Sequence, residues 1–377
     1  MNSARKSGSD ALSEEKEPIL NKREAIAKWK AIVSDYQKPN LRLAIWQIIN
    51  TIGGYCLIWY LMYLSLSVSW WLTIPLAILA GGFLIRVFII FHDCGHGSFF
   101  QSRRANDIWG FITGLLTFTP YYQWRWEHSV HHSTTGDLDR RGVGDIWTFT
   151  VEEYLQSSRW KKFSYRLARN PVILFIIAPL FIFVIRQRFP TPNAKPREVA
   201  SVWIMNFAII ALAAGLIAIY GFLPWLIIQT IAMGVAGSAG VWLFYVQHQF
   251  EDAYWERSED WDYTTAAMQG SSFYKLPKIL QWFSGNIGFH HIHHLSSRIP
   301  NYNLERCHRS DPMFKEVVPL TLTGSLKSIT FRLWDEKARK LISFRQLRKL
   351  QKAEEDGKAD PEDNETKPDA LEQGERK

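Results

Sequence analysis

LAIWQIINTIGGYCLIWYLMYLSLSVSWWLTIPLAILAGGFLI, residues 43–85, is a stretch without a single charged side chain. An α-helix rises about 1.5 Å per residue, so the stretch is long enough to cross a hydrocarbon layer of about 30 Å twice. We therefore predict a helical hairpin with spans at about residues 44–66 and 71–91. The Trp70–Trp71 pair suits a turn in the headgroup region. Arg86 is expected to extend its side chain to the opposite interface.

A second uncharged run extends from residue 199 to residue 250 and is interrupted by Gly221 and Pro224. Because Gly and Pro mark turns, this run predicts a second hairpin, with spans at about residues 201–220 and 224–246. The expected fold class is an all-α integral membrane protein, with four transmembrane helices in two hairpins and a helical cap on the cytosolic side.

A shorter apolar segment, residues 171–185, is flanked by basic residues on both sides. Lys and Arg collect in cytoplasmic loops, so both ends of this segment are expected on the cytosolic side, and the segment is expected to enter the interface without crossing. The flanking basic residues are Lys161, Lys162, Arg166, Arg186, Arg188, Lys195 and Arg197.

The charge balance favours a membrane surface over a nucleic acid as the partner. Of the 377 residues 47% are hydrophobic, and Lys plus Arg exceed Asp plus Glu by 44 to 36. The basic residues crowd near the ends of the apolar runs, which is typical of a surface that faces anionic lipid. Cys56, Cys94 and Cys307 are too widely spaced for a disulfide framework or a thiolate metal site.

Three regions follow from this pattern. Residues 1–42 mix acidic and basic side chains without an apolar core, so we expect a cytosolic segment and no signal or transit peptide. Residues 43–340 contain the spans and form the membrane domain. Residues 341–377 are polar and poor in aromatics, which predicts a disordered tail.

Eight of the eleven histidines fall into three short groups. Residues at i, i+3 and i+4 share one face of a helix, so each group can direct its imidazoles at one point. Eight convergent imidazoles exceed what one tetrahedral zinc ion accepts, so the pattern predicts two metal ions. The groups are His92 and His96; His128, His131 and His132; and His290, His293 and His294.

One isolated pair of histidines is more often surface or core decoration than a metal site. Three groups, each beside an apolar run on the same inferred side of the membrane, favour a single metal centre. The apolar segment 108–119 lies between the first two groups, so it too is expected to stay at the interface without crossing. His248 stands alone at the end of the last span, and it is interpreted either as an interfacial histidine or as a ninth ligand. His291, His308 and Cys94 receive no ligand role.

A ligating histidine usually donates its second ring N–H to a carboxylate or an amide. Several such acceptors lie near the groups, although each also fits a solvated side chain or a helix cap. The candidates are Asp93, Glu127, Asp137, Asp145, Asp252 and Asn286.

Three segments, HDCGHGSFF (92–100), WEHSVHHSTTGDLDRRG (126–142) and GFHHIHHLSSRIPNYNL (288–304), resemble the histidine boxes of the membrane fatty acid desaturases in order and approximate separation. The resemblance covers about residues 43–302 and makes residues 43–340 a desaturase domain. It implies a diiron centre, with two iron ions held by the eight box histidines and His248 as the ninth ligand. It also implies an oxidoreductase that uses O2 and two electrons to introduce a cis double bond into an acyl chain.

The details of the boxes imply the partners. The first box is HxxxH, which is similar to the acyl-lipid delta-12, omega-6 or delta-5 type and departs from the HxxxxH of the stearoyl-CoA type, so a membrane lipid acyl chain is the expected substrate. No HPGG motif of a fused cytochrome b5 is present. A separate ferredoxin, flavodoxin or cytochrome b5 is therefore expected as electron donor. The active site is expected on the cytosolic face of a multi-pass protein of the bacterial plasma membrane.

An acyl substrate requires a dry, narrow cavity beside the metals. Gly81, Gly82, Gly234, Gly237 and Gly240 could open one, although close helix packing also explains glycines in spans. Trp124, Trp126 and Trp282 could line the site or form an interfacial belt. Two rival functions stay open: a hydroxylase or ketolase of the same family acting on lipid, alkane or carotenoid, and a metal transporter, whose ligands would lie nearer the bilayer midplane.

Overall fold

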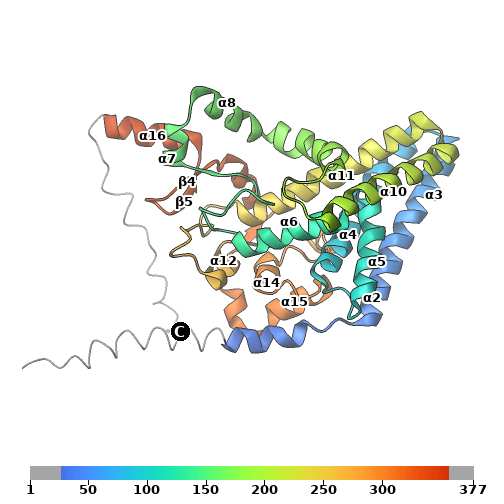
Figure 1. Ribbon diagram of the computed structural model, residues 1–377, viewed down its shortest axis with the longest axis horizontal. Helices are drawn as coiled ribbons and strands as arrows, with labels where there is room; N and C mark the ends of the chain where they lie inside the picture. The colour runs from blue at the N-terminus through green and yellow to red at the C-terminus, as the bar shows by residue number, and fades with distance from the viewer. Residues whose placement is uncertain (1–26, 356–377) are drawn as a thin grey trace, which may run out of the picture.

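The computed structural model describes residues 27–355, and four of its helices are long and apolar enough to cross a membrane. They gather on the right of Figure 1, and a cap of shorter helices and strands lies on the left. The first span joins α2 (Leu41–Ile48), a π-helical turn η1 (Ile49–Gly53) and α3 (Gly54–Leu66); the others are α4 (Trp70–His96), α10 (Pro196–Tyr220) and α11 (Phe222–His248). The predicted fold class is confirmed. Each span extends beyond its predicted bounds at the end nearest the cap.

Short polar residues and glycines set the ends of these helices. Asn40 accepts a hydrogen bond from the Leu43 amide, and Ser69 accepts one from the Trp71 amide, so each supplies a cap for the helix that follows. Gly97, with φ +69°, ends α4 directly after His96. Gly221, with φ +80°, separates α10 from α11. Both positions need the left-handed backbone that glycine adopts without strain.

Arg86 corrects one expectation from the sequence. Its side chain is buried and does not extend to the interface, because α4 continues for ten residues beyond it. The guanidinium donates to Thr51 Oγ1 at 3.0 Å and to the carbonyl of Trp282, and it stacks over the Trp282 ring at 4.1 Å. These partners compensate a cation inside a span, as such a charge requires.

The cap is built from the segments between and after the hairpins, and α4 packs against α3, α5 and α11 to join the cap to the spans. Strand β1 pairs in parallel with β4, which pairs antiparallel with β5; β2 and β3 form a separate parallel pair. The helices are α5 (Arg103–Leu116), α6 (Tyr121–Thr134), α7 (Val151–Gln156), α8 (Arg159–Ala168), α12 (Tyr263–Gln269), α13 (Lys278–Phe283), α14 (His290–Leu295), α15 (Asn301–Ser310) and α16 (Phe344–Glu355). The strands are β1 (Phe149–Thr150), β2 (Phe273–Lys275), β3 (Pro319–Thr321), β4 (Leu333–Asp335) and β5 (Lys340–Ile342), and the 3-10 turns η5 (Pro312–Lys315) and η6 (Gly324–Thr330) complete the cap.

The predicted interfacial segment 171–185 belongs to a bent helix. It consists of η2 (Ile173–Ile177), α9 (Ala178–Leu180), η3 (Phe181–Ile185) and η4 (Arg186–Arg188), and it meets α8 at an angle of 59°. η2 and η3 are π-helical turns, which are rare and often mark functional sites. The segment packs along α11, where a Cβ on Gly237 would lie 2.9 Å from the Cβ of Pro179.

The prediction that residues 341–377 are disordered is wrong for residues 341–355. Residues 340–355 form β5 and α16, because Phe344 and Leu347 pack into a core with Tyr154 and Tyr165. The expectations for residues 1–26 and 356–377 lie outside the described residues.

Candidate metal centre

Nine buried or half-buried histidines converge where α4, α6, α11 and α14 meet. The end of α4 carries His92 and His96, and the end of α11 carries His248. Helix α6 contributes His128, His131 and His132, and α14 contributes His290, His293 and His294. The structure therefore brings together all eight histidines of the three groups and His248.

Five of these histidines form a first cluster. One ring nitrogen from each can be chosen so that all five lie within 4.8 Å of one another. Two close contacts fix the cluster: His132 Nε2 lies 3.1 Å from His128 Nε2 and 3.0 Å from His293 Nε2. The members are His92, His96, His128, His132 and His293.

The remaining four form a second cluster beside the first. Ring nitrogens of His131, His248 and His294 meet the same 4.8 Å limit, and His290 Nε2 lies 3.0 Å from His248 Nε2. The two clusters are adjacent, since the rings of His132 and His294 stack with centroids 4.2 Å apart.

The chemistry of this donor set fits metal ions. Burial holds the pKa of the α6 and α14 members His128, His132, His290, His293 and His294 well below 6.5, so these imidazoles are neutral and have a free lone pair. His96 Nε2 and His294 Nε2 are buried and have no hydrogen-bond partner within residues 27–355. Unpaired buried polar atoms are costly, and a metal ion would satisfy them.

Two of the six predicted acceptors contact a cluster histidine. Asp93 Oδ1 lies 3.0 Å from His92 Nδ1, and Asp145 Oδ1 lies 2.5 Å from His131 Nδ1. The other oxygen of Asp93 accepts from the backbone amide and side chain of Asn301 at 2.6 and 2.8 Å. These contacts occupy Nδ1 and leave Nε2 of each ring available to bind a metal ion.

The structure does not place the other four candidates against a cluster ring. Glu127 accepts from Thr191 and lies 3.9 Å from Arg186, and Asp137 accepts from Arg140 and Ser258. Asp252 is exposed and makes no hydrogen bond to any histidine of the described residues. Asn286 bonds Gln281 and the carbonyl of Asn301. Proximity in sequence misleads here, because Asp137, Asp252 and Asn286 lie in loops outside the helices that carry the histidines.

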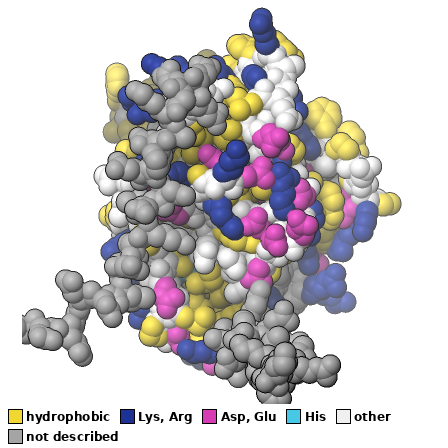
Figure 2. All heavy atoms as spheres, turned by 90° about the vertical axis from the view of Figure 1, so that its left-hand side faces the viewer, with side chains coloured by type: hydrophobic (Ala, Val, Ile, Leu, Met, Phe, Trp, Pro, Cys, Tyr) yellow, Lys and Arg dark blue, Asp and Glu magenta, His cyan; other side chains and the backbone are white. Residues whose placement is uncertain are grey.

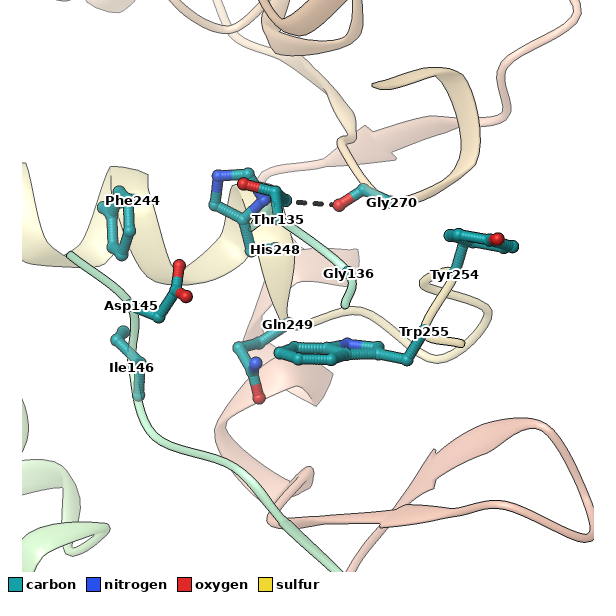
Figure 3. Close-up of a pocket in the computed structure, with 10 residues that line it drawn as sticks. All are labelled: Thr135, Gly136, Asp145, Ile146, Phe244, His248, Gln249, Tyr254, Trp255 and Gly270. Carbon is teal, nitrogen blue, oxygen red and sulfur yellow. Dashed lines mark hydrogen bonds between the residues drawn. The ribbon is translucent and has the colours of Figure 1, made fainter. Parts of the chain in front are cut away.

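The second cluster borders a small recess, drawn in Figure 3. His248 Nδ1 lies 3.3 Å from the carbonyl oxygen of Gly270, the dashed contact of the figure, and Asp145 lines the same recess. A carbonyl acceptor at Nδ1 leaves Nε2 of His248 facing His290. This contact distinguishes His248 from an ordinary interfacial histidine.

Several residues near the centre have contacts that the sequence did not reveal. Trp124 stacks on His128 with centroids 4.4 Å apart, and the Tyr263 hydroxyl donates to the carbonyl of His294 at 2.7 Å. His291 Nε2 lies 3.1 Å from His308 Nδ1, a buried pair behind α14. The spacing of His291 excludes it from the shared face of its group, but nothing in the sequence indicates His308 as its partner.

An apolar cavity of about 380 Å³ opens beside the first cluster. His92, His128 and His290 lie in its wall, and the remaining wall comes from α4, α6, α11, the loop at residues 144–146, the bent segment 173–188 and the single residues Thr117 and Ile287. Gly237 and Gly240 both line it, and Trp124 lies in its wall. Gly81 and Gly82 serve packing instead, because a Cβ there would approach Val235 and Phe283.

Four spans, two buried polyhistidine clusters and an apolar cavity that reaches them define a metal-dependent membrane enzyme with an apolar substrate. The model of the fatty acid desaturase family matches residues 69–321, and the chain belongs to this family. It is a fatty acid desaturase, an oxidoreductase, as the resemblance of the histidine boxes implied.

Its relatives agree with this assignment. A fatty acid desaturase of Bacillus subtilis (strain 168) is 49% identical over 318 residues, which cover 84% of this chain and 90% of that protein. An sn-1 oleoyl-lipid 12-desaturase of Synechocystis sp. is 28% identical over 280 residues, covering 70% of this chain and 74% of that protein. An sn-1 acyl-lipid omega-3 desaturase (ferredoxin) of Synechocystis sp. is 27% identical over 254 residues, covering 63% and 66%.

Proposed function

We propose that this desaturase acts on lipid-linked acyl chains and holds two iron ions with its nine clustered histidines. The observation that carries the proposal is the pair of clusters at the wall of the apolar cavity. Five imidazoles within 4.8 Å exceed the four ligands of a tetrahedral zinc site, and imidazole is a suitable ligand for iron. The cluster of five would hold one ion, and His131, His248, His290 and His294 would hold the other.

The chemistry is a balanced oxidation. Two hydrogens leave adjacent carbons of the acyl chain, and two further electrons and two protons arrive from a donor, so that one O2 becomes two waters and the chain gains one double bond. Iron, when bound, supplies the activation of O2. The protein supplies the rest. Its apolar cavity wall holds the acyl chain and excludes water, and Asp93 and Asp145 orient the ring nitrogens of His92 and His131.

The size and position of the cavity and the names of the relatives both support a lipid-linked substrate. Two relatives from Synechocystis sp. are named as acyl-lipid and oleoyl-lipid desaturases. The cavity, at about 380 Å³, lies within the range of small-molecule sites and is bounded by membrane-spanning helices, where an acyl chain can enter from the bilayer.

We further infer that the cap faces the cytosol at a bacterial plasma membrane. The basic residues that flank the spans support this orientation. Helix α8 exposes Trp160 and Phe163 beside Lys161 and Lys162, a combination that suits an anionic lipid surface. The relative from Bacillus subtilis supports the bacterial location.

A separate protein would deliver the electrons to the cap. Figure 2 shows acidic and basic side chains interleaved on one face of the cap. Charged residues of the cap also form ion pairs, such as Arg257 with Asp139 and Glu336, both at 2.7 Å. One relative is named as ferredoxin-dependent, which supports a ferredoxin over the other small electron carriers.

Expression in a bacterium that lacks the product tests this proposal. We expect fatty acid methyl esters with one new double bond in the phospholipid fraction, and about two irons per chain in the purified protein. The His131→Ala variant should lose the new double bond and the bound iron, whereas His308→Ala, outside the clusters, should keep its iron. Hydroxylated esters without a new double bond, or a single tightly held zinc, would contradict the proposal.

A further inference from the structure

We propose that Gln187 binds the ester linkage of the lipid-linked acyl chain and thereby fixes where the chain lies relative to the metal clusters. This inference rests on the proposed function and names a substrate-binding residue for it. It starts from the bent segment 173–188, which forms one wall of the cavity. The wall residues are Leu174, Ala178, Ile182, Phe183 and Gln187, and only Gln187 is polar.

Gln187 is buried, at 7% exposure, and its amide oxygen has no hydrogen-bond partner among the described residues. Other polar side chains of the same cavity have partners. Gln247 donates to the carbonyl of Ile287 at 3.0 Å, and Thr117 donates to the carbonyl of Thr113 at 2.9 Å. Asp145 and Glu127, also in the wall, bond His131 and Thr191. The unpaired amide of Gln187 therefore differs from its neighbours.

An unpaired amide in an apolar wall destabilises the folded protein, and buried polar groups without a partner are rare. The methyl end of an acyl chain offers no hydrogen bond, so it cannot compensate. The ester at the other end of the chain has a carbonyl oxygen that can accept a hydrogen bond from the amide. An amide donates through Nε2 and accepts through Oε1, and rotation by 180° exchanges the two, so the orientation that turns Nε2 toward the cavity lets Gln187 donate to an ester carbonyl.

The charges around Gln187 fit a phospholipid rather than a free acid. Arg186 precedes it; its side chain is 41% exposed, and its guanidinium donates to the Phe189 carbonyl and to Thr191 Oγ1, both at 3.3 Å. The only carboxylate near this guanidinium among the described residues is Glu127, at 3.9 Å, which is already bonded by Thr191. With a phosphate beside Arg186, an ester at Gln187 and an acyl chain along the apolar wall, the three parts of a glycerophospholipid would follow in their covalent order.

The test compares Gln187→Met with a matched glutamine on the neighbouring helix. Gln123 in α6 is buried too, but its amide is fully used: Oε1 accepts from the Thr191 amide at 2.9 Å, and Nε2 donates to the carbonyl of Phe189 at 3.4 Å. Met has nearly the shape of Gln without its polar atoms. In detergent without added lipid, Gln187→Met should keep or raise the wild-type Tm, whereas Gln123→Met should lower it.

Added lipid should raise the Tm of the three proteins to different extents. Dipalmitoyl phosphatidylglycerol should raise the Tm of the wild type and of Gln123→Met, and raise it less in Gln187→Met. The KM for phospholipid acyl chains should rise about tenfold in Gln187→Met at unchanged iron content, because one hydrogen bond to the substrate is lost. The products of this variant should also carry double bonds at more than one position. Gln187→Asn, which keeps the amide, should recover part of the affinity.

Two results would overturn the inference. One is a fall in the Tm of Gln187→Met equal to that of Gln123→Met, with KM and double-bond position as in the wild type. The other is an equal loss of response to palmitic acid and to the phospholipid in Gln187→Met, which would indicate a general defect of the cavity. A wild type that forms no double bond would refute the proposed function itself, and is seen before any variant is made.

Discussion

Gly240 and Gly237 lie one helical turn apart in α11, line the same cavity, and should respond to substitution in opposite ways. A Cβ on Gly240 meets no atom within 4 Å, so a side chain there would extend into the cavity without displacing protein atoms. A Cβ on Gly237 would lie 2.9 Å from the Cβ of Pro179, whose ring cannot turn away. We therefore expect Gly240→Val to change the substrate range and Gly237→Ala to change the stability.

The magnitudes follow from burial. Val adds three carbons to the cavity and would displace two or three methylenes of the substrate. At about 0.8 kcal/mol per buried methylene, this costs about 2 kcal/mol of binding, or about thirtyfold in kcat/KM for the longest accepted chains. Gly237→Ala should destabilise the fold by about 1–3 kcal/mol through overpacking, partly offset by about 0.5–1 kcal/mol from the helix preference of Ala.

The assay supplies acyl chains of graded length to cells that express each variant, and reads the products as methyl esters. Gly234→Val is the matched control, because a Cβ there also meets open space but does not line the cavity. We expect shorter chains to be favoured by Gly240→Val alone, with a wild-type Tm. An unchanged chain-length profile in Gly240→Val, or the same shift in Gly234→Val, would refute this account of the cavity.

Three further outcomes are expected. Asp145→Asn should weaken metal binding about tenfold to a hundredfold, since it loses the carboxylate at His131, while Asp137→Asn should not, as measured by metal content during dialysis against a chelator. In the metal-free protein the lowered pKa of His128, His132, His290, His293 and His294 means that the unfolded chain binds more protons than the folded chain near and below pH 6.5. The unfolding free energy should therefore fall most steeply below pH 6.5, by up to about 1.4 kcal/mol per histidine per pH unit, which lowers the Tm; a flat Tm profile down to pH 5.5 would contradict this. Leu347→Ala should expose α16 to proteolysis at a cost of about 2–5 kcal/mol, whereas the exposed Leu350→Ala should leave cleavage unchanged.

The spans and the histidine groups were predictable because both depend on local periodicity. An uncharged run of this length can only be buried in a bilayer, and the spacing of His128 and His132, like that of His92 and His96, determines that each pair shares a helix face. The folding of residues 344–355 was not predictable in the same way. Residues 344–355 are polar on average, and they fold only because Phe344 and Leu347 find Tyr154 and Tyr165, which lie far away in the sequence.

The division of the histidines between two clusters was also beyond the sequence. His131 and His132 are neighbours in one helix, yet they belong to different clusters, because α11 brings His248 to one side of α6 and α4 brings His96 to the other. Asp145 becomes a partner of His131 through a loop whose path no local pattern specifies. Such contacts depend on how helices cross, and a single sequence carries little information about crossing.

One helix, α4, nevertheless connects the candidate metal centre with the cavity. Leu84, Phe88 and His92 follow one another at intervals of four residues in α4, so they share one face, and all three line the cavity. About 12 Å along the helix axis separates Leu84 from His92. Because α4 continues without interruption through all three positions, this depth is set by a rigid helix and not by a loop. In the proposed function, the part of an acyl chain beyond the reacting carbons would therefore be measured against the same helix that carries His92, one of the histidines proposed to bind iron.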